Sequence, residues 1–333
     1  MFVEAIEAIL QDACTPGAVR AIEAGGSPRA LWGAIADAGF LELLVPEEEG
    51  GAGLTLPELA PVLIGMGRYP LPVPLAQSVA ARALLCRAGL PVPAGMITLA
   101  QTGLRDTDGS VVCPVTPYGA IADHVLLARD GDLLLLDADK ADRAATGVHR
   151  DQAATLRWPA SAIPVAVPSA GADVAAWGAA LHAALIAGAG RRVLDLTLQF
   201  CNDRSQFGRP IGKFQAVQHQ LSVMAELAAA ARIAAQIAFA GDGEQPDRMA
   251  AAVAKARTSE AAATIAATAH ALHGAIGITE EYDLQLLTRR LHQWRMAHGS
   301  EAFWDPMIGA ACLASGQASV VDFIRSVTDC TAR

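Results

Sequence analysis

Apolar residues recur at helical spacing over most of the first 90 positions of the chain. In the opening segment MFVEAIEAILQDAC they stand three and four positions apart, as on one face of a helix. The same spacing follows Ser27-Pro28, a pair that favours the start of a helix. Residues 78–88 predict one more helix before the pattern changes. We therefore expect an N-terminal helical domain over residues 1–92.

The spacing is different between residues 93 and 170. Short Val- and Leu-rich runs such as ITLAQ, SVVCPVT and HVLLARDGDLLLLDA alternate there with turn residues, and no helix of ordinary length fits. Arg129-Asp130-Gly131-Asp132 lies between two of these runs, which predicts a β-hairpin. We expect a small β domain over residues 93–170.

Long Ala- and Leu-rich runs with helical spacing occupy the rest of the chain. The expected helices lie near 173–203, 214–241, 246–272 and 283–296, and a last one begins after about 301. Four long helices with short connections favour an antiparallel bundle, so the domain over residues 171–333 is predicted to be helical. The expected fold class is mainly α, with a small β domain between two helical domains.

Composition narrows the choice of function. Hydrophobic residues make up 53% of the 333 positions and charged residues 18%, which argues against disorder. A net charge of −9 without a basic block argues against nucleic acid or an anionic membrane as partner. Six scattered cysteines without CxxC favour a cytoplasmic protein with reduced thiols and no metal site. Residues 174–190 are uncharged but too few for a membrane span, so we expect a buried helix there.

Three motifs stand out on this framework. They are LWGAIADAGFLELLVPEEEGGAGLTLPEL at 31–59, RSQFGRPIGKFQAVQ at 204–218 and LHGAIGITEEYDLQLLTRR at 272–290. A plain connection between helices needs the glycines and the proline of the second motif, but not Arg204, Gln206 and Phe207. In order and position the three motifs resemble those of the acyl-CoA dehydrogenase family, and the resemblance covers nearly the whole chain.

The resemblance implies a reaction and a shared cofactor. Enzymes of this family desaturate acyl-CoA thioesters: a carboxylate removes the α proton while the β hydrogen leaves as hydride to FAD. FAD lies at a subunit interface, so its site has two halves from two subunits. By resemblance, Arg204 would pair with the pyrophosphate and Phe207 would pack at the adenine side. The other contacts implied on this side come from Gln206, Gln215 and Gly274.

The second half of the implied site departs from the family pattern. The loop that wraps the flavin normally reads T-E-P-x-x-G-S-D, whereas residues 98–109 read TLAQTGLRDTDG. His298 stands where most members carry the Glu base, and Gly178 stands at the position that a second subset uses. Neither position supplies a carboxylate. Ser300 matches the family's Thr beside the flavin and is the remaining contact on this side.

A chain with only one half of the site resembles the base-lacking subunit of heteromeric α2β2 acyl-CoA dehydrogenases that act on bulky steroid side-chain CoA thioesters. This interpretation implies a paralogous partner subunit, FAD shared with it, an acyl-CoA substrate and an electron-transfer flavoprotein as acceptor. It also implies free space for a large acyl group where this chain's own base would stand.

Three alternatives stay open at this point. A self-sufficient homotetramer would use His298 or Glu301 as its base. The same fold could carry different flavin chemistry, such as that of a monooxygenase or a nitroalkane oxidase. The chain could also be a structural paralogue that binds no cofactor.

Overall fold

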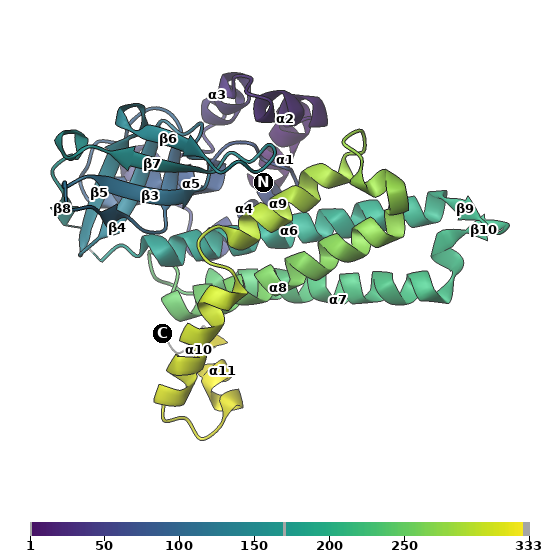
Figure 1. Ribbon diagram of the computed structural model, residues 1–333. Coiled ribbons are helices and arrows are strands. Elements are labelled where there is room, and N and C mark those ends of the chain that lie inside the picture. Colours follow the sequence, from purple (N-terminus) through teal and green to yellow (C-terminus); the bar gives the residue numbers. More distant parts are fainter. Residues whose placement is uncertain (1, 169–170, 329–333) are drawn as a thin grey trace.

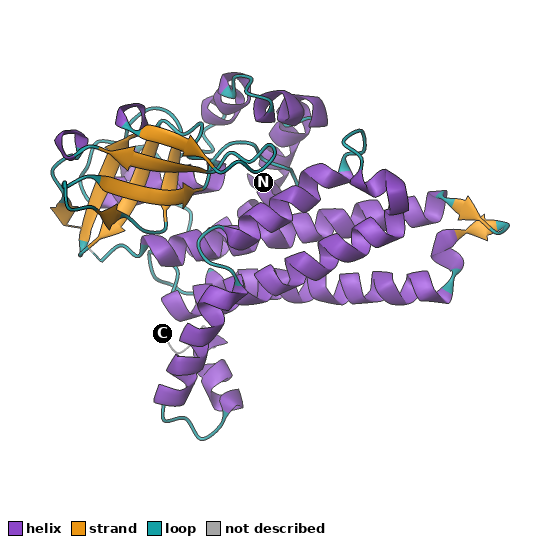
Figure 2. Ribbon diagram, viewed as in Figure 1, coloured by secondary structure: helices purple, strands orange, loops and turns teal. Residues whose placement is uncertain are grey.

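A helical N-terminal unit and a β domain lie together at one end of a long helical bundle (Figures 1 and 2). The computed structural model describes residues 2–168 and 171–328. The domain boundary predicted at residue 170 and the last residues of the predicted C-terminal domain, 329–333, lie outside the described residues.

The N-terminal unit begins its helices at sequence signals that the chain supplies locally. It consists of α1 (Phe2–Ala13), α2 (Pro16–Glu23), α3 (Arg29–Asp37), α4 (Leu56–Gly67) and α5 (Leu75–Arg87). Thr55 caps α4 in a capping box, in which its backbone N–H donates to Glu58 Oε2 at 2.9 Å. A run of three prolines then separates α4 from α5. Pro cannot donate a helical hydrogen bond, so the run prevents one continuous helix.

The β domain consists of two four-stranded sheets, drawn in orange in Figure 2. One sheet has the order β1-β4-β5-β8 and the other β2-β3-β7-β6. The strands are β1 (Ile97–Ala100), β2 (Leu104–Arg105), β3 (Val111–Thr116), β4 (His124–Arg129), β5 (Asp132–Asp137), β6 (Asp142–Ala145), β7 (Ala154–Trp158) and β8 (Val167–Pro168). The predicted hairpin joins β4 to β5, and Asp130 and Gly131 both have positive φ, as a tight two-residue hairpin turn requires.

The C-terminal bundle is built around α6, which contacts α4, α7, α8 and α9. Its helices are α6 (Val174–Asp203), α7 (Gln215–Ala238), α8 (Arg248–His273) and α9 (Leu284–Met296), followed by α10 (Glu301–Ala314) and α11 (Val320–Thr328). A short hairpin of β9 (Ser205–Gln206) and β10 (Arg209–Pro210) connects α6 to α7. The predicted bundle helices agree with these bounds to within three residues at each end, and the predicted fold class is confirmed.

Two apolar segments of the bundle are long enough to cross a membrane by length and composition, Gln215–Ala238 and Arg248–Ile278. Core helices pass the same test, and both segments pack against α6 here. The second one carries the fully buried Lys255. Only 39% of the most apolar window of each is buried, so both leave surface for contact with another chain. The uncharged start of α6, residues 174–190, is buried except at Ala175, in agreement with the predicted buried helix.

Two glycines allow α4 and α6 to cross closely. A Cβ at Gly188 on α6 would lie 2.0 Å from the Ile64 carbonyl oxygen, and one at Gly67 on α4 would lie 2.3 Å from the Leu185 carbonyl oxygen. Both obstacles are backbone atoms of buried helices, so neither can move aside cheaply. This crossing fixes the N-terminal unit on the bundle.

We predict that Gly188→Ala lowers the free energy of unfolding by about 3 kcal/mol, because the added methyl forces the two helices apart. Gly33→Ala is the matched control, since nothing lies within 4 Å of a Cβ at that helical position. It should stabilise the protein by up to about 1 kcal/mol. Urea unfolding of both variants gives the comparison, and equal effects at the two sites would contradict the tight crossing.

Candidate functional site

The β9–β10 hairpin projects beyond the end of the bundle, opposite the β domain (Figure 1). Phe207 and Gly208 form its turn with φ of 54° and 80°. The Phe207 ring is 91% exposed. On β10 of the hairpin, Arg209 Cζ lies 4.1 Å from the centroid of the Phe214 ring, a cation–π contact. The hairpin therefore presents an aromatic ring and positive charge to solvent.

Arg204 stands at the base of this hairpin with a fixed backbone. Its N–H donates to the Phe200 carbonyl at 2.9 Å, and its carbonyl accepts from Ile211 N–H at 2.8 Å. Its guanidinium has no ion-pair partner within residues 2–168 and 171–328. An exposed cation on a rigid backbone is suited to bind an anionic group from another molecule.

The end of α8 lies beside the end of α6. The Phe200 ring stacks on His273 with centroids 4.3 Å apart, which brings the turn after each helix to the same end of the bundle. Gly274 follows His273 with φ 63° and ψ −144°, a conformation open to glycine but strained for other residues. Nothing lies within 4 Å of a Cβ placed on it. Its backbone is therefore open to close approach by a ligand.

The structure thus brings five of the predicted cofactor-binding residues to one exposed end of the bundle. They are Arg204, Gln206, Phe207, Gln215 and Gly274. The structure of the chain by itself does not test whether these residues contact FAD, so their role stays a prediction.

Both candidate base positions meet at the opposite end of α6. Gly178 lies in the second turn of α6, and His298 lies in the loop between α9 and α10. A Cβ at Gly178 would lie 2.0 Å from His298 Nδ1. The two positions therefore converge on one point in space, and the imidazole of His298 already occupies it. With His298 only 2% exposed, the free space expected at this point is not there.

His182 packs against the His298 ring, which also contacts Gly178. Its ring stacks on His298 with centroids 5.1 Å apart. Its Nδ1 lies 2.7 Å from the Gly178 carbonyl and its Nε2 lies 3.2 Å from the Gln77 side-chain nitrogen. The carbonyl can only accept, so Nδ1 carries the proton and Nε2 accepts from Gln77. Burial is the main cause that lowers the pKa of His182 well below its usual value, so this ring is neutral.

Lys255 holds the loop that carries His298. Its Nζ donates to the carbonyls of Arg295 and Gly299, both at 2.7 Å, and to Ser259 Oγ at 2.9 Å. Burial lowers the pKa of Lys255 to about 7. These bonds fix the loop although His298 has a φ of 54°. Burial, and then the nearby Lys255 cation, lower the pKa of His298 to about 4.

This geometry does not present His298 as a general base. A base must lie within hydrogen-bond reach of the proton that it removes, and His298 is enclosed by Gly178 and His182. The nearby Leu99 backbone raises the pKa of His298 slightly against burial and the Lys255 cation, but it makes no hydrogen bond of good geometry with either ring nitrogen. Neither ring nitrogen has a hydrogen-bond partner among the described residues. The imidazole therefore acts here as a packed, neutral ring.

Glu301, the other candidate base, is also engaged. Arg295 Nε donates to Glu301 Oε2 at 3.0 Å and Nη2 donates to Oε1. This hydrogen bonding from Arg295 is the main cause that lowers the pKa of Glu301, so the group is an ionised and paired carboxylate. Ser300, directly before it, is the N-cap of α10, but its side chain makes no capping hydrogen bond.

Ser300 lies at the His298 end, far from the other predicted cofactor contacts. From Gly178 to Arg204 the chain runs along α6 for 26 residues, about 39 Å at 1.5 Å per residue. One dinucleotide cannot reach both ends of this helix. If all the predicted contacts are used, Ser300 and the hairpin residues serve two different cofactor sites.

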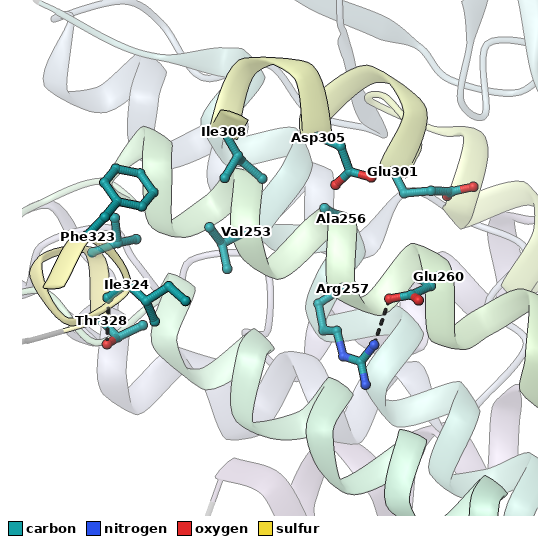
Figure 3. Close-up of a pocket in the computed structure, with 11 residues that line it drawn as sticks. Val253, Ala256, Arg257, Glu260, Glu301, Asp305, Ile308, Phe323, Ile324 and Thr328 are labelled. Atoms are coloured by element: carbon teal, nitrogen blue, oxygen red, sulfur yellow. Dashed lines mark hydrogen bonds and ion pairs between the residues drawn. The ribbon is translucent and has the colours of Figure 1, made fainter. Parts of the chain in front are cut away.

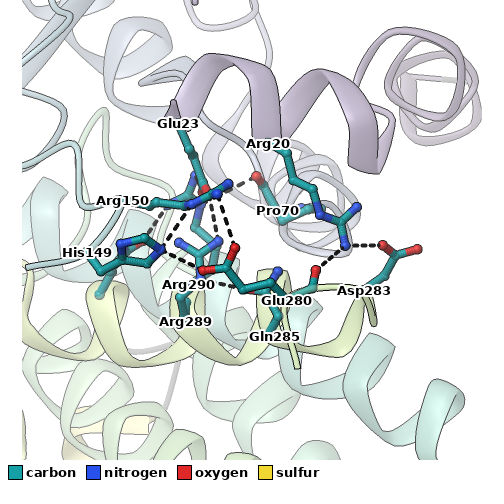
Figure 4. Close-up of polar contacts among 11 residues, drawn as sticks. Arg20, Glu23, Pro70, His149, Arg150, Glu280, Asp283, Gln285, Arg289 and Arg290 are labelled. Atoms are coloured by element: carbon teal, nitrogen blue, oxygen red, sulfur yellow. Dashed lines mark hydrogen bonds and ion pairs between the residues drawn. The ribbon is translucent and has the colours of Figure 1, made fainter. Parts of the chain in front are cut away.

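The third motif has a structural role that Figure 4 shows. The side chain of Glu23 on α2 is fully buried and binds Arg289 at 2.6 Å and Arg290 at 2.7 Å. Glu280 binds His149 and Arg150 of the β domain at 2.8 and 3.2 Å. Charged groups from all three parts of the chain meet at this junction, which fixes the start of α9 and hence the direction of the loop to His298.

The sequence analysis did not identify the buried polar residues Lys255, His182 and Gln77. It also missed the ion pairs of Glu23 with Arg289 and Arg290. The available signals were weak: a single lysine within an Ala-rich helix, and a histidine within an uncharged one. Such residues are rarely buried unless their polar atoms have partners. Neither signal says which distant residue the partner is.

We predict that Gly178→Ala lowers the free energy of unfolding by about 1–3 kcal/mol, because its methyl group overlaps the His298 ring. His298→Ala should also destabilise the protein, because it leaves a cavity. The loss of unfolding free energy in the double variant should be smaller than the sum of the two single losses by at least about 1 kcal/mol. The reason is that the methyl group added at residue 178 fills space that the imidazole has left. Denaturant unfolding of the four proteins measures this coupling. Strictly additive losses would show that the two positions are not in contact.

A second prediction concerns acid stability. The pKa of His298 is about 4 in the fold, against about 6.5 for an unfolded histidine. Between these values the unfolded chain binds a proton that the folded chain does not, so stability falls as pH decreases from 6.5 to 4, by up to about 3 kcal/mol. His298→Asn should flatten this part of the profile, as urea midpoints measured across the range would show.

His219→Asn serves as the control for the acid profile, because His219 is exposed on α7. It should leave the slope unchanged. An unchanged slope in His298→Asn would contradict the burial of a neutral imidazole. Lys255 and His182 face the same ring, and both remain in the two variants.

Comparisons with known proteins agree with the family resemblance of the three sequence motifs. Residues 1–89 match the family model of the acyl-CoA dehydrogenase N-terminal domain, and residues 172–312 match that of the C-terminal domain. The curated acyl-CoA dehydrogenase IpdE2 of Mycolicibacterium smegmatis is 35% identical over 298 residues, which cover 87% of this chain and 90% of that protein. The β domain lies between the two matched segments.

Solved structures show the same fold. The structure named Tcur3481-Tcur3483 steroid ACAD G363A variant has a TM-score of 0.82 and 29% identity, and the match covers 96% of this chain and 98% of that chain. The ChsE4-ChsE5 complex from Mycobacterium tuberculosis has a TM-score of 0.83 at 23% identity, with 95% and 97% of the two chains covered. Two matched domains, and a relative 35% identical over nearly its whole length, show that this chain belongs to the acyl-CoA dehydrogenase family of oxidoreductases.

Proposed function

We propose that this chain is the base-lacking subunit of an FAD-dependent acyl-CoA dehydrogenase, and that it completes the FAD site of a paralogous partner in an α2β2 assembly. One observation carries the proposal. The point where both family base positions meet is filled by the neutral His298 ring, while the predicted cofactor contacts at the other end of α6 stay exposed.

The exposed end fits one part of the cofactor. Arg204 would pair with the pyrophosphate through its planar guanidinium. Phe207 would pack at the adenine side, and Gln206 and Gln215 would add polar contacts. Gly274 would let backbone approach the cofactor, because no side chain stands there. FAD supplies the hydride acceptor when bound, and these residues only hold and orient it.

The partner then supplies the carboxylate base and the loop over the flavin, for which residues 178, 298 and 98–109 of this chain offer no match. The substrate class that we propose is a bulky, steroid-type acyl-CoA thioester, supported by the name of the steroid ACAD structure that this chain resembles. By family we propose an electron-transfer flavoprotein as acceptor. We also propose a cytoplasmic location, and the five described cysteines are all free thiols.

The open alternatives receive less support. A homotetramer with its own base would need His298 or Glu301 to reach substrate, but one is enclosed and the other is bound to Arg295. Different flavin chemistry would still need a flavin site in this chain. A structural paralogue without any cofactor contact remains, and flavin content separates it from our proposal.

We predict that the chain purified alone is colourless, and that co-expression with the paralogous subunit gives a yellow complex with about half the FAD of a homotetramer. In that complex, Arg204→Ala should raise the FAD dissociation constant about 10- to 100-fold, as expected for the loss of a charge-assisted hydrogen bond of about 1.5–3 kcal/mol. Visible absorbance and equilibrium dialysis measure both results.

Arg192→Ala is the matched control, because Arg192 is an exposed arginine on the same helix α6, with no ion-pair partner in the described part of the chain. It should leave FAD binding unchanged. A yellow homo-oligomer of this chain that oxidises an acyl-CoA would contradict the heteromer, and unchanged FAD affinity in Arg204→Ala would contradict the shared contact.

A further inference from the structure

A groove of about 480 Å³ lies between α8 and the projecting pair α10 and α11 (Figure 3). Its volume is in the range of specific binding sites. Val253 and Ala256 line it from α8, Ile308 from α10, and Phe323 and Ile324 from α11. The floor is therefore apolar, and the Ile324 side chain remains 51% exposed.

The charged residues of the groove gather at one end, near the start of α10, as Figure 3 shows. Glu260, Glu301 and Asp305 are the acids there. Arg257 binds Glu260 at 2.6 Å, and Glu301 is paired with Arg295. Asp305 has no ion-pair partner in the described part of the chain. The groove therefore has an apolar end and an end with an uncompensated carboxylate.

This groove does not suit a dinucleotide. Glu301 directly follows Ser300, the residue that would contact a flavin held by this chain, so the groove lies beside that position. A pyrophosphate carries negative charge, and Asp305 would repel it. The cation at this end, Arg257, is already bound to a carboxylate. The chain's own residues here do not fit FAD.

The groove does suit a hairpin of the type that this chain itself carries. Residues 204–214 contain Arg204, Arg209 and Lys213 but no acid, and Phe207 stands exposed at the tip. An aromatic tip matches the apolar end and arginines match the acidic end. Two related subunits pair in a nearly symmetric way, so a contact made by one hairpin is matched by the reciprocal contact of the other.

We propose that the groove between α8, α10 and α11 receives the aromatic-tipped, basic hairpin of the partner subunit, protein against protein, with no cofactor between them. This inference rests on the proposed function, because it requires a paralogous partner with a corresponding hairpin. It gives the assembly two unlike interfaces: one that holds FAD at this chain's hairpin, and one that is closed by the partner's hairpin.

Site-specific photo-cross-linking in the co-purified complex tests the occupant. A benzophenone side chain at Ile324, inside the groove, should cross-link to the partner segment that corresponds to residues 204–214, and mass spectrometry identifies the peptide. The same probe at Val165, which is 90% exposed in the β domain, should not reach that segment. Cross-linking from Ile324 to a second copy of this chain, to another partner segment or to nothing would overturn the proposal.

Charge reversal gives an independent test. Asp305→Arg should raise the dissociation constant between the two subunits at least 10-fold in sedimentation experiments, without changing the circular dichroism of the isolated chain, because Asp305 is exposed. Asp142→Arg, on the exposed strand β6, should change neither. Equal subunit affinity in both variants would overturn the proposal.

Flavin content distinguishes failure of this inference from failure of the proposed function. Both together require one FAD for each pair of subunits. A second FAD for each pair would place a cofactor in the groove and overturn the docking of the hairpin, while leaving the Arg204 contact intact. If Arg204→Ala leaves FAD binding unchanged, the proposed function falls, and the docking inference falls with it.

Discussion

The contact between the His298 ring and the bare backbone of Gly178 is the constraint on which the rest of the account depends. A side chain at residue 178 and the present side chain at 298 cannot coexist, because a Cβ would lie 2.0 Å from Nδ1. The loop that carries His298 is in turn held by Lys255, which donates to two of its carbonyls. Burial lowers the pKa of Lys255 to about 7, and its buried Nζ is stabilised only while these acceptors stay in place. The two positions at which the family resemblance predicts a base are therefore parts of one packed core contact.

Because α6 is long, the packed His298–Gly178 contact and the exposed hairpin are far apart, and this separation bears on how the chain assembles with a partner. The closed position and the exposed hairpin lie at opposite ends of one straight helix of 30 residues. Residues at the two ends therefore cannot act on the same cofactor within one chain. The hairpin end of α6 is exposed, whereas the His298 end is buried within the chain. This agrees with our proposal of a subunit that contributes residues to a neighbour's site.

Much of the fold was predictable because its signals are local. Helix bounds in the bundle follow from apolar spacing, and the β4–β5 hairpin follows from Asp130-Gly131 between two apolar runs. The grouping of Arg204 and Gly274 could be inferred only through the family motifs, because the contact that joins them, Phe200 on His273, lies between different helices. The closure at Gly178 was not predictable. Spacing along a chain does not reveal that a loop 120 residues later packs its side chain against Gly178, so the free space that the family resemblance implies there is absent.

A density map of the complex formed by this chain and its paralogous partner tests the central claim most directly. The account predicts FAD at the interface formed by this chain's Arg204 end, with the carboxylate base on the partner subunit, and no FAD beside this chain's Ser300. Density for FAD next to His298 and Ser300 of this chain would contradict it.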